Sequence, residues 1–382
     1  MRIHNDSVNQ MTKLSLVLTG NEPRQRYLFD AISSTLHVPC VLGFDDIDPI
    51  TKLAAATLSL SWPRSEWWKN YQMHPLVQIR RRHILSRGLS AIKEDIDALL
   101  MWGSWFQPPP LPAKKLPFFN YIDQSHSLHN LPGERKGRFA RRVRAHALQA
   151  ATYEASAGIF CMSEWARTQT LESHRVHPRK VVTVGWGPCG IDLSVHNFTD
   201  VERDPIVLHV SNDFYRKGID FLLSTAERVH VAVPTARFLV IGEDAGGKKL
   251  PSSDYVLFLG RISDKQILAD YFRKASLFFL PHRFDRSPHV LVEAMSAALP
   301  LVASYQGGAI ELIEKTGTGF LIQSGDISGY ADCIISLLRD QHLQRAMGQR
   351  SQELMKQKYN WPVIASRIGD IIVQTITKGG AP

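Results

Sequence analysis

The chain has 382 residues, of which 44% are hydrophobic and 21% charged, a composition typical of a globular protein long enough for two domains. It contains no run of about 18 apolar residues, which argues against a membrane-spanning helix. Its four cysteines lack the spacing of a metal site, and the N-terminal segment lacks the apolar core of a secretory signal. We therefore expect a cytoplasmic protein with reduced cysteines and no bound metal.

The net charge of +9 is concentrated in the first half of the chain. Residues 1–203 hold 25 Lys and Arg against 18 Asp and Glu, whereas the remainder holds 20 against 18. The excess gathers at Arg80–Arg82 with Arg87, and again between Arg135 and Arg144. Such clusters attract anionic surfaces, but no nucleic-acid-binding motif accompanies them, so nucleic acid is not an expected partner. An anionic membrane or a phosphorylated acceptor is one interpretation, and a solvated helix face is the other.

The first half of the chain alternates short apolar runs with helical patterns, as in a parallel sheet covered by helices. We expect strands within the segments 13–20, 95–105, 116–126, 155–163 and 180–185. The segment 186–193 is expected to form the linker that follows this half.

Two features of the first half have more than one interpretation. His126, which follows the apolar run FFNYI, is a candidate for contact with a ligand, and Asp123 and His129 are alternative candidates nearby. A single histidine, however, is more often a structural hydrogen-bonding group than a ligand contact. The tryptophan-rich stretch Ser61–Tyr71 suits stacking on a sugar ring or contact with a membrane interface. Core packing and a lid suit it equally well, and the sequence leaves these alternatives open.

The second half alternates strands and helices at lengths typical of a doubly wound parallel sheet. Strands are expected at 206–211, 236–244 and 255–260, near Leu277 and near Leu301. An amphipathic helix is expected at the C-terminus, within 358–376. Because ligands of such sheets bind beyond the carboxyl ends of the strands, a site is expected in the loops that follow them.

Two basic residues, Arg216 and Lys217, lie in the loop after the first of these strands, directly before Gly218. At the carboxyl end of a strand, two cations can hold a diphosphate. An isolated pair of this kind would be interpreted as charged residues flanking a helix.

Two carboxylates, Asp285 and Glu293, lie eight positions apart around the start of an expected helix. We expect Ser287 to cap this helix and Pro288 to occupy its first turn, where unpaired N–H groups suit an anion. Glu293 lies more than a turn inside the helix, where a carboxylate suits the hydroxyls of a ligand better than it suits the helix dipole. The alternative for Asp285 is a loop acid paired with Arg283 or Arg286.

This part of the chain resembles the donor-site signature of retaining glycosyltransferases of the GT-B type, family 4. The matching residues are Asp285-x7-Glu293, Ala294-Met295, Pro300–Ala303 and Gly307-Gly308. The family signature usually has Glu where this chain has Asp285, a Gly-Phe-Gly-like segment at 286–288, and an Arg where this chain has Asn212. The resemblance extends through the last half of the chain and is weaker in the first half, where it implies a helix that begins at Ser163.

The resemblance implies an α/β fold of GT-B architecture, with two Rossmann-like doubly wound domains facing across a cleft. Residues 1–200 would form the acceptor-binding domain and residues 201–357 the donor-binding domain. The terminal segment 358–382 would pack back on the first domain.

The resemblance also implies a role for each candidate residue. Arg216 and Lys217 would neutralise the departing diphosphate, and Glu293 would bond the ribose hydroxyls. Asp285 and His126 would contact the transferred sugar. The remaining donor-binding positions that it implies are Gly218, Arg261, Ile262, Ser287, Pro288, His289, Val290, Gly307 and Gly308.

The activity implied is transfer of a hexose-type sugar from a nucleoside-diphosphate sugar to an acceptor hydroxyl, with retained configuration and without a metal or other cofactor. The implied partners are the nucleotide sugar and a glycan or lipid-linked acceptor of bacterial polysaccharide or lipid-linked glycan synthesis. Peripheral contact with the inner face of an anionic membrane would fit the basic first half. Two alternatives remain: a nucleotide-sugar-binding or membrane-attached module without turnover, and a sugar-nucleotide epimerase or phosphorylase of the same fold.

Overall fold

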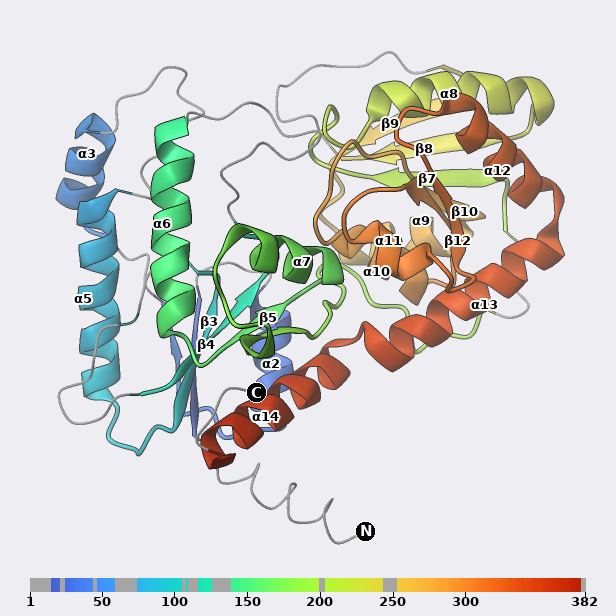
Figure 1. The fold of residues 1–382 in the computed structure, drawn as a ribbon. Coiled ribbons are helices and arrows are strands. Elements are labelled where there is room, and N and C mark those ends of the chain that lie inside the picture. The colour runs from blue at the N-terminus through green and yellow to red at the C-terminus, as the bar shows by residue number, and fades with distance from the viewer. Residues whose placement is uncertain are drawn as a thin grey trace, which may run out of the picture. The chain divides into compact units, whose positions relative to one another are not determined.

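The structure is a computed structural model that describes residues 15–20, 25–43, 47–58, 74–104, 108, 116–125, 139–198, 203–242 and 253–378. The chain divides into two compact units (Figure 1). Among the described residues, the first unit holds those of 15–185 and 361–378, and the second holds those of 186–360. The chain thus passes between the units at 185/186 and 360/361, whereas the sequence predicts boundaries at 200/201 and 357/358.

The first unit contains a six-stranded parallel sheet with the strand order β2-β1-β3-β4-β5-β6. Its strands are β1 (Leu16–Thr19), β2 (Val41–Leu42), β3 (Ala98–Trp102), β4 (Phe118–Ile122), β5 (Gly158–Cys161) and β6 (Val181–Thr183). Helices cover both faces of such a sheet, so its strands are apolar runs rather than alternating ones. Five strands lie where the sequence predicts them, and β2 was missed because two residues carry no pattern.

The helices of the first unit are α2 (Gln25–Ser33), α3 (Pro49–Leu58), α5 (Pro75–Ala91), α6 (Phe139–Ala155), α7 (Glu164–Ser173), the short 3-10 helix η2 (Pro178–Lys180) and α14 (Trp361–Lys378). Ser163 caps α7 as predicted, because its Oγ accepts a hydrogen bond from the Ala166 N–H at 3.0 Å. The terminal helix α14 packs beside α2 (Figure 1). Its fully buried side chains, among those described, are Ile364, Ala365, Ile368 and Ile372.

The second unit contains another six-stranded parallel sheet, in the order β12-β11-β10-β7-β8-β9. Its strands are β7 (Ile206–Val210), β8 (Arg237–Ile241), β9 (Val256–Gly260), β10 (Leu277–Leu280), β11 (Leu301–Ser304) and β12 (Gly319–Ile322). From β7 the chain builds outward through β8 and β9, and it then returns to place β10 on the other side of β7. The pair β7–β10 is therefore the switch point of the sheet, where ligands of such folds bind.

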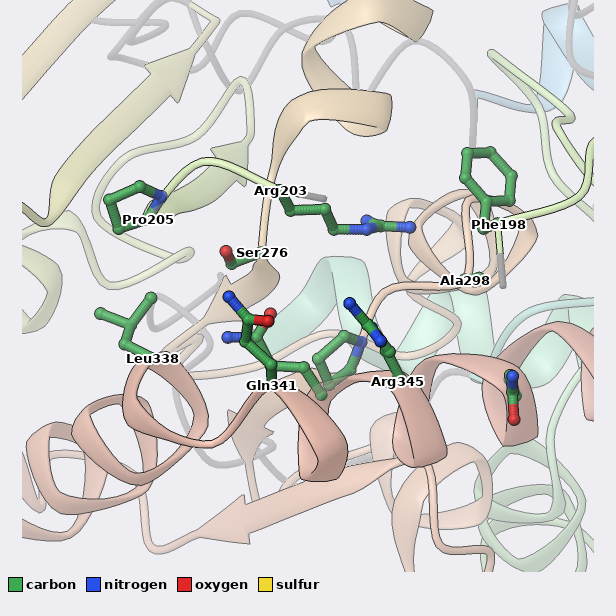
Figure 2. A pocket seen from close by; sticks show the side chains of 11 residues that line it. Phe198, Arg203, Pro205, Ser276, Ala298, Leu338, Gln341 and Arg345 are labelled. Atoms are coloured by element: carbon green, nitrogen blue, oxygen red, sulfur yellow. The ribbon is translucent and has the colours of Figure 1, made fainter. Parts of the chain in front are cut away.

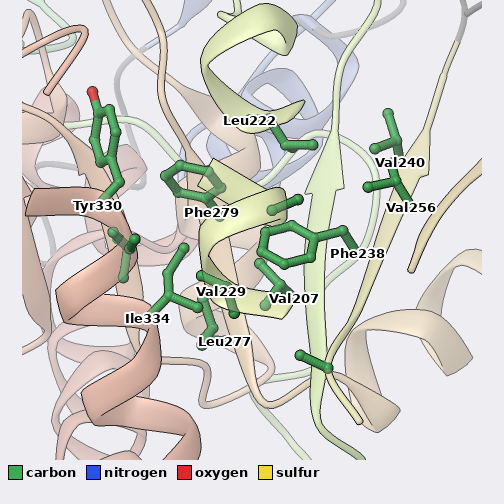
Figure 3. Packing of buried hydrophobic residues seen from close by; sticks show 14 of the residues in the cluster. Val207, Leu222, Val229, Phe238, Val240, Val256, Leu277, Phe279, Tyr330 and Ile334 are labelled. Atoms are coloured by element: carbon green, nitrogen blue, oxygen red, sulfur yellow. The ribbon is translucent and has the colours of Figure 1, made fainter. Parts of the chain in front are cut away.

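The helices of the second unit are α8 (Ile219–Ala232), α9 (Lys265–Lys274), α10 (His289–Ser296), α11 (Ala309–Ile313), α12 (Ile327–Arg339) and α13 (Gln341–Lys358). Helices α8 and α12 pack side by side on one face of the sheet. Figure 3 shows the core that they enclose, in which Leu222 and Ile334 from the helices meet Phe238 and Phe279 from the strands. Each fully buried side chain of this size contributes about 1.5–3 kcal/mol. This core fixes the strands whose ends carry the candidate site.

Within the residues that the structure describes, no helix is both long enough and apolar enough to span a membrane.

Candidate functional site

The switch point of the second sheet brings together three residues that the sequence singles out. Arg216 and Lys217 follow β7, and Asp285 follows β10. Lys217 Nζ donates a hydrogen bond to Asp285 Oδ2, and Arg216 Nη1 lies 3.8 Å from Asp285 Oδ1. The side chains of Lys217 and Asp285 are only 8% and 14% exposed. We call these three residues the switch-point cluster.

The Arg216 guanidinium is held by two further contacts. Its Nε donates to Asp213 Oδ2 at 3.1 Å, and its Nη1 donates to the Phe284 carbonyl at 3.2 Å. The first bond ties it to its own loop and the second to the loop after β10. Asp213 was missed in the sequence, although an acid three positions before an Arg in a turn is a common pairing.

The charge state of Asp285 is set by its neighbours. Burial alone would raise the pKa of this carboxyl, but Lys217, Arg216 and His282 act against burial and hold the pKa well below its ordinary value. Asp285 thus pairs with Lys217, and not with Arg283 or Arg286 as the alternative interpretation of the sequence had it. Arg283 instead forms a two-pronged ion pair with Asp220, with N···O distances of 2.7 and 2.5 Å.

Two glycines allow the loops around the cluster to approach each other. Gly218 has φ +71°, and a Cβ there would lie 1.9 Å from the Pro281 carbonyl oxygen. Gly307 has φ +56°, and a Cβ there would lie 1.8 Å from the Asp285 carbonyl oxygen. The next residue, Gly308, donates its N–H to that same oxygen at 3.3 Å. Only glycine fits these two close approaches without moving the loops.

The start of helix α10 differs by one residue from the prediction. The helix begins at His289, so that Pro288 occupies the cap position and makes no side-chain capping bond. The prediction that Ser287 caps the helix is therefore wrong, since Ser287 lies one position too early to reach the amides of the first turn. Its Oγ is buried and bonds no atom of the described residues. Val290 lies in the first turn and is half-buried.

Glu293 lies inside α10 and is 7% exposed. Its Oε1 accepts hydrogen bonds from the N–H groups of Gly190 at 2.7 Å and Cys189 at 3.2 Å. His289 Nδ1 lies 2.8 Å from the Gly187 carbonyl oxygen and 3.2 Å from Cys189 Sγ. The segment Gly187–Gly190 is therefore part of the surroundings of Glu293. No local sequence pattern predicts this contact, which joins positions more than a hundred residues apart.

Two buried histidines next to the cluster were also missed. His282 Nδ1 lies 2.9 Å from the Leu280 carbonyl oxygen and its Nε2 lies 3.2 Å from that of Gln306. His209, within β7, is fully buried. Burial lowers the pKa of His282, and it lowers the pKa of His209 to about 4, against 6.5 in water. For His209, the signal in the sequence is a histidine inside the apolar run of a predicted strand.

The remaining candidates are less closely tied to the cluster. Arg261 is exposed and Ile262 is half-buried, and both directly follow β9 at the same edge of the sheet. Arg261 makes no hydrogen bond or ion pair with the residues that the structure describes. His126 lies outside the described residues. Among the described residues, no group of three His, Cys, Asp or Glu side chains is arranged to hold a metal ion.

Part of the second unit is similar to a known protein family. Residues 204–340 match the family model described as glycosyl transferases group 1. N-acetyl-alpha-D-glucosaminyl L-malate synthase of Bacillus anthracis is 30% identical over 173 residues, which cover 44% of this chain and 44% of that protein. The chain thus matches less than half the length of this curated relative.

Two solved structures are similar over nearly the whole chain. Sucrose-phosphate synthase of Thermosynechococcus elongatus has a TM-score of 0.68 at 18% identity, covering 96% of this chain and 100% of that one. Anabaena HepE in complex with UDP has a TM-score of 0.63 at 15% identity, covering 94% and 100%. At these identities the likeness shows the fold, which is the α/β GT-B fold with two Rossmann-like units. The match to the model of glycosyl transferases group 1, at residues 204–340, lies within the second unit.

Proposed function

We propose that the chain is a glycosyltransferase that moves a hexose-type sugar from a nucleoside-diphosphate sugar to an acceptor hydroxyl. The observation that carries this proposal is the switch-point cluster, in which Lys217 and Arg216 meet Asp285 within a group 1 glycosyltransferase domain. The UDP bound to HepE, a protein of the same fold, supports a nucleoside diphosphate as part of the donor.

The donor diphosphate would lie between the cations of the cluster and the N-terminus of α10. N–H groups in the first turn of a helix have no partner within the helix, and the helix dipole favours an anion there. His289 and Val290 carry such N–H groups. Gly218 and Gly307 hold the loops close enough for these donors and the cations to converge.

The nucleoside and the sugar would occupy the two sides of the diphosphate. Glu293, oriented by its bonds to the Gly190 and Cys189 amides, would accept hydrogen bonds from the ribose hydroxyls. Asp285 would bond hydroxyls of the transferred sugar and share Lys217 with the diphosphate. The buried Ser287 Oγ would gain a partner in the donor.

The proposed reaction retains the anomeric configuration and needs neither a metal nor another cofactor. Lys217 and Arg216 would stabilise the negative charge that develops on the leaving diphosphate, which is the electrostatic contribution expected of preorganised charges. The departing phosphate would itself take the proton from the acceptor hydroxyl, on the same face of the sugar. No protein nucleophile is assigned, and His126 would contact the sugar.

The first unit would bind the acceptor, and it carries a surface suited to an anionic membrane. On α3 and α5, Ile50, Leu53 and Ile79 are 80%, 68% and 66% exposed. Arg82 and Arg87 are exposed on the same helix α5. We call these five residues the α3–α5 surface. Exposed apolar side chains beside basic ones are typical of peripheral membrane binding, which supports a lipid-linked or surface glycan acceptor of bacterial origin on the cytoplasmic side.

Product analysis tests this proposal. The chain would be incubated with UDP-, GDP- and ADP-sugars and a set of hydroxyl acceptors, with and without EDTA, and the product examined by NMR. We expect transfer from one donor, the same anomeric configuration in product and donor, and no loss of rate in EDTA. An inverted anomer would contradict retention, and a loss in EDTA that Mg²⁺ restores would contradict metal independence. An epimerised sugar, or no release of nucleotide, would favour the alternatives of the same fold.

A further inference from the structure

A cavity lies in the second unit, at the end of the sheet opposite the switch-point cluster. Its volume is about 130 Å³, and its walls include residues just before β7, β10 and β11 together with one side of α13 (Figure 2). The amino ends of parallel strands all lie at one edge of a sheet, whereas Lys217 and Asp285 follow carboxyl ends. The cavity is therefore separate from the proposed donor site.

One wall of the cavity holds a largely buried guanidinium. Arg203 Nη1 donates to the Ala275 carbonyl at 2.8 Å, and Arg203 Nη2 donates to the Ala297 carbonyl at 2.7 Å. The guanidinium carbon lies 5.3 Å from the centre of the Phe198 ring. These two bonds use two of its five N–H donors, and the other three donate to no atom of the described residues.

Among the described residues, no carboxylate pairs with this buried charge. Burial lowers the pKa of Arg203 to about 10, which still leaves the side chain positive at neutral pH. None of the described side chains that line the cavity is acidic, and the neighbouring Asp204 is exposed and is not among them. Buried charges in proteins are usually paired with an opposite charge. Here the opposite charge is missing from the described part of the chain.

A second guanidinium enters from the other wall. Arg345 extends from α13 toward the cavity that Arg203 reaches from the segment before β7 (Figure 2). Within the described residues, Arg345 forms neither a hydrogen bond nor an ion pair. Gln341 and Gln344, on the same helix, add amide groups to the lining.

We propose that this cavity binds a small oxyanion, a phosphate or carboxylate group, between Arg203 and Arg345. Guanidinium groups match such oxyanions with paired hydrogen bonds, and two of them facing a cavity without an acid make it electropositive. The volume of about 130 Å³ is close to the roughly 150 Å³ of a cavity that accommodates benzene, a molecule larger than a phosphate or carboxylate group. The anion would tie the segment before β7 to α13. This inference does not depend on the proposed transferase activity.

Thermal unfolding tests the site with inorganic phosphate and with citrate as probes, each compared with NaCl at equal ionic strength. We expect one or both anions to raise the midpoint of the wild type more than NaCl does, and the stronger anion identifies the class. Arg345→Gln should raise the apparent Kd at least about tenfold, because it removes charge-assisted hydrogen bonds. Lys358→Gln, which removes an exposed charge from the same helix outside the cavity, should leave the Kd unchanged.

The design separates this cavity from the switch-point cluster, which also attracts anions. If the stabilisation by phosphate survives in Arg345→Gln and disappears in Lys217→Met, the anion occupies the cluster and the proposal is wrong. Absence of stabilisation by either anion would overturn it as well. Arg345→Lys keeps the positive charge but loses the paired N–H donors of the guanidinium, and it should retain more affinity than Arg345→Gln. Circular dichroism confirms that each variant is folded.

Discussion

Lys217 and Asp285 form a mostly buried ion pair whose two members come from different loops. Because both side chains are shielded from water, removal of one partner leaves the other charge without compensation. Arg216, at 3.8 Å, compensates Asp285 only in part. The same pair would serve the donor, since a diphosphate arriving at Lys217 replaces one anionic partner with another.

The ion pair predicts a strong coupling between its two residues. Lys217→Met should lower the free energy of unfolding by about 3 kcal/mol, because it leaves the Asp285 carboxylate largely buried without its main partner. The double variant Lys217→Met/Asp285→Asn should recover most of that loss. Urea unfolding measures both, with the exposed Lys274→Met as the matched control. The single variant Asp285→Asn completes the cycle, and a loss in the double variant equal to the sum of the two single losses would mean that the pair has no coupling.

His209 predicts a pH dependence of stability. Its pKa is about 4 in the folded chain and 6.5 in water, so between these values the unfolded chain binds more protons. Stability should therefore fall as the pH falls below about 6.5, by about 2 kcal/mol at pH 5 from this residue. His282, whose pKa is also lowered, acts in the same direction.

Urea midpoints of the wild type and His209→Gln between pH 7.5 and pH 5 check this expectation. The variant should lose less stability over the interval than the wild type, whatever its stability at pH 7.5. Parallel curves for the two proteins would show that His209 does not titrate in this way.

At the scale of elements, Gly218 allows the loops after β7 and β10 to approach each other closely. It has φ +71°, and a Cβ there would collide with the backbone of the facing loop at 1.9 Å. Gly260, at the end of β9, has nearly the same φ of +67° but no atom within 4 Å of a Cβ. The two positions therefore differ in the contact and not in the backbone conformation.

This pair of glycines gives a matched prediction. Gly260→Ala should cost only the strain of a left-handed residue, about 1 kcal/mol. Gly218→Ala should cost at least about 2 kcal/mol more, because the loops must also separate. Chemical unfolding measures both variants. Equal losses at the two positions would contradict the close approach of the loops.

The elements also show what the sequence could predict and why. The strands β7, β8, β9, β10 and β11 were predicted because buried parallel strands are continuous apolar runs between turn residues. The start of α10 was missed by one residue, since Ser287-Pro288 is equally compatible with a Ser or a Pro at the cap. The meeting of Lys217 with Asp285 follows from the strand order, which a local pattern does not determine; the family signature predicted only that both residues belong to one donor site. The bonds from Glu293 to Gly190, and the cavity at Arg203, depend on tertiary packing that no local pattern records.

At the scale of the whole molecule, the chain builds one unit, crosses at 185/186 to build the second, and returns at 360/361 to add α14 to the first. The group 1 family match covers residues 204–340 in the second unit, whereas the excess of basic residues lies in the first half of the chain. This division fits a donor site in one unit and an acceptor surface in the other.

The α3–α5 surface predicts binding to anionic vesicles. Sedimentation with phosphatidylglycerol-containing vesicles should capture the wild type, and pure phosphatidylcholine vesicles should not. The double variant Ile79→Ser/Arg82→Gln removes one exposed apolar side chain and one charge, each charge being worth about 1 kcal/mol near such a surface. It should bind at least about fivefold more weakly. Arg228→Gln, an exposed charge in the second unit, is the control, and equal binding by all three proteins would contradict a role for this surface.

Thermal unfolding with UDP, GDP and ADP tests most directly whether the second unit carries a donor site. One nucleotide, at about 100 times its Kd, should stabilise the wild type by roughly 2.7 kcal/mol, which raises the midpoint by at least a degree or two. Lys274→Met should keep this shift and Lys217→Met should lose it. No shift with any nucleotide, or a shift that survives in Lys217→Met, would contradict a donor site at the switch-point cluster.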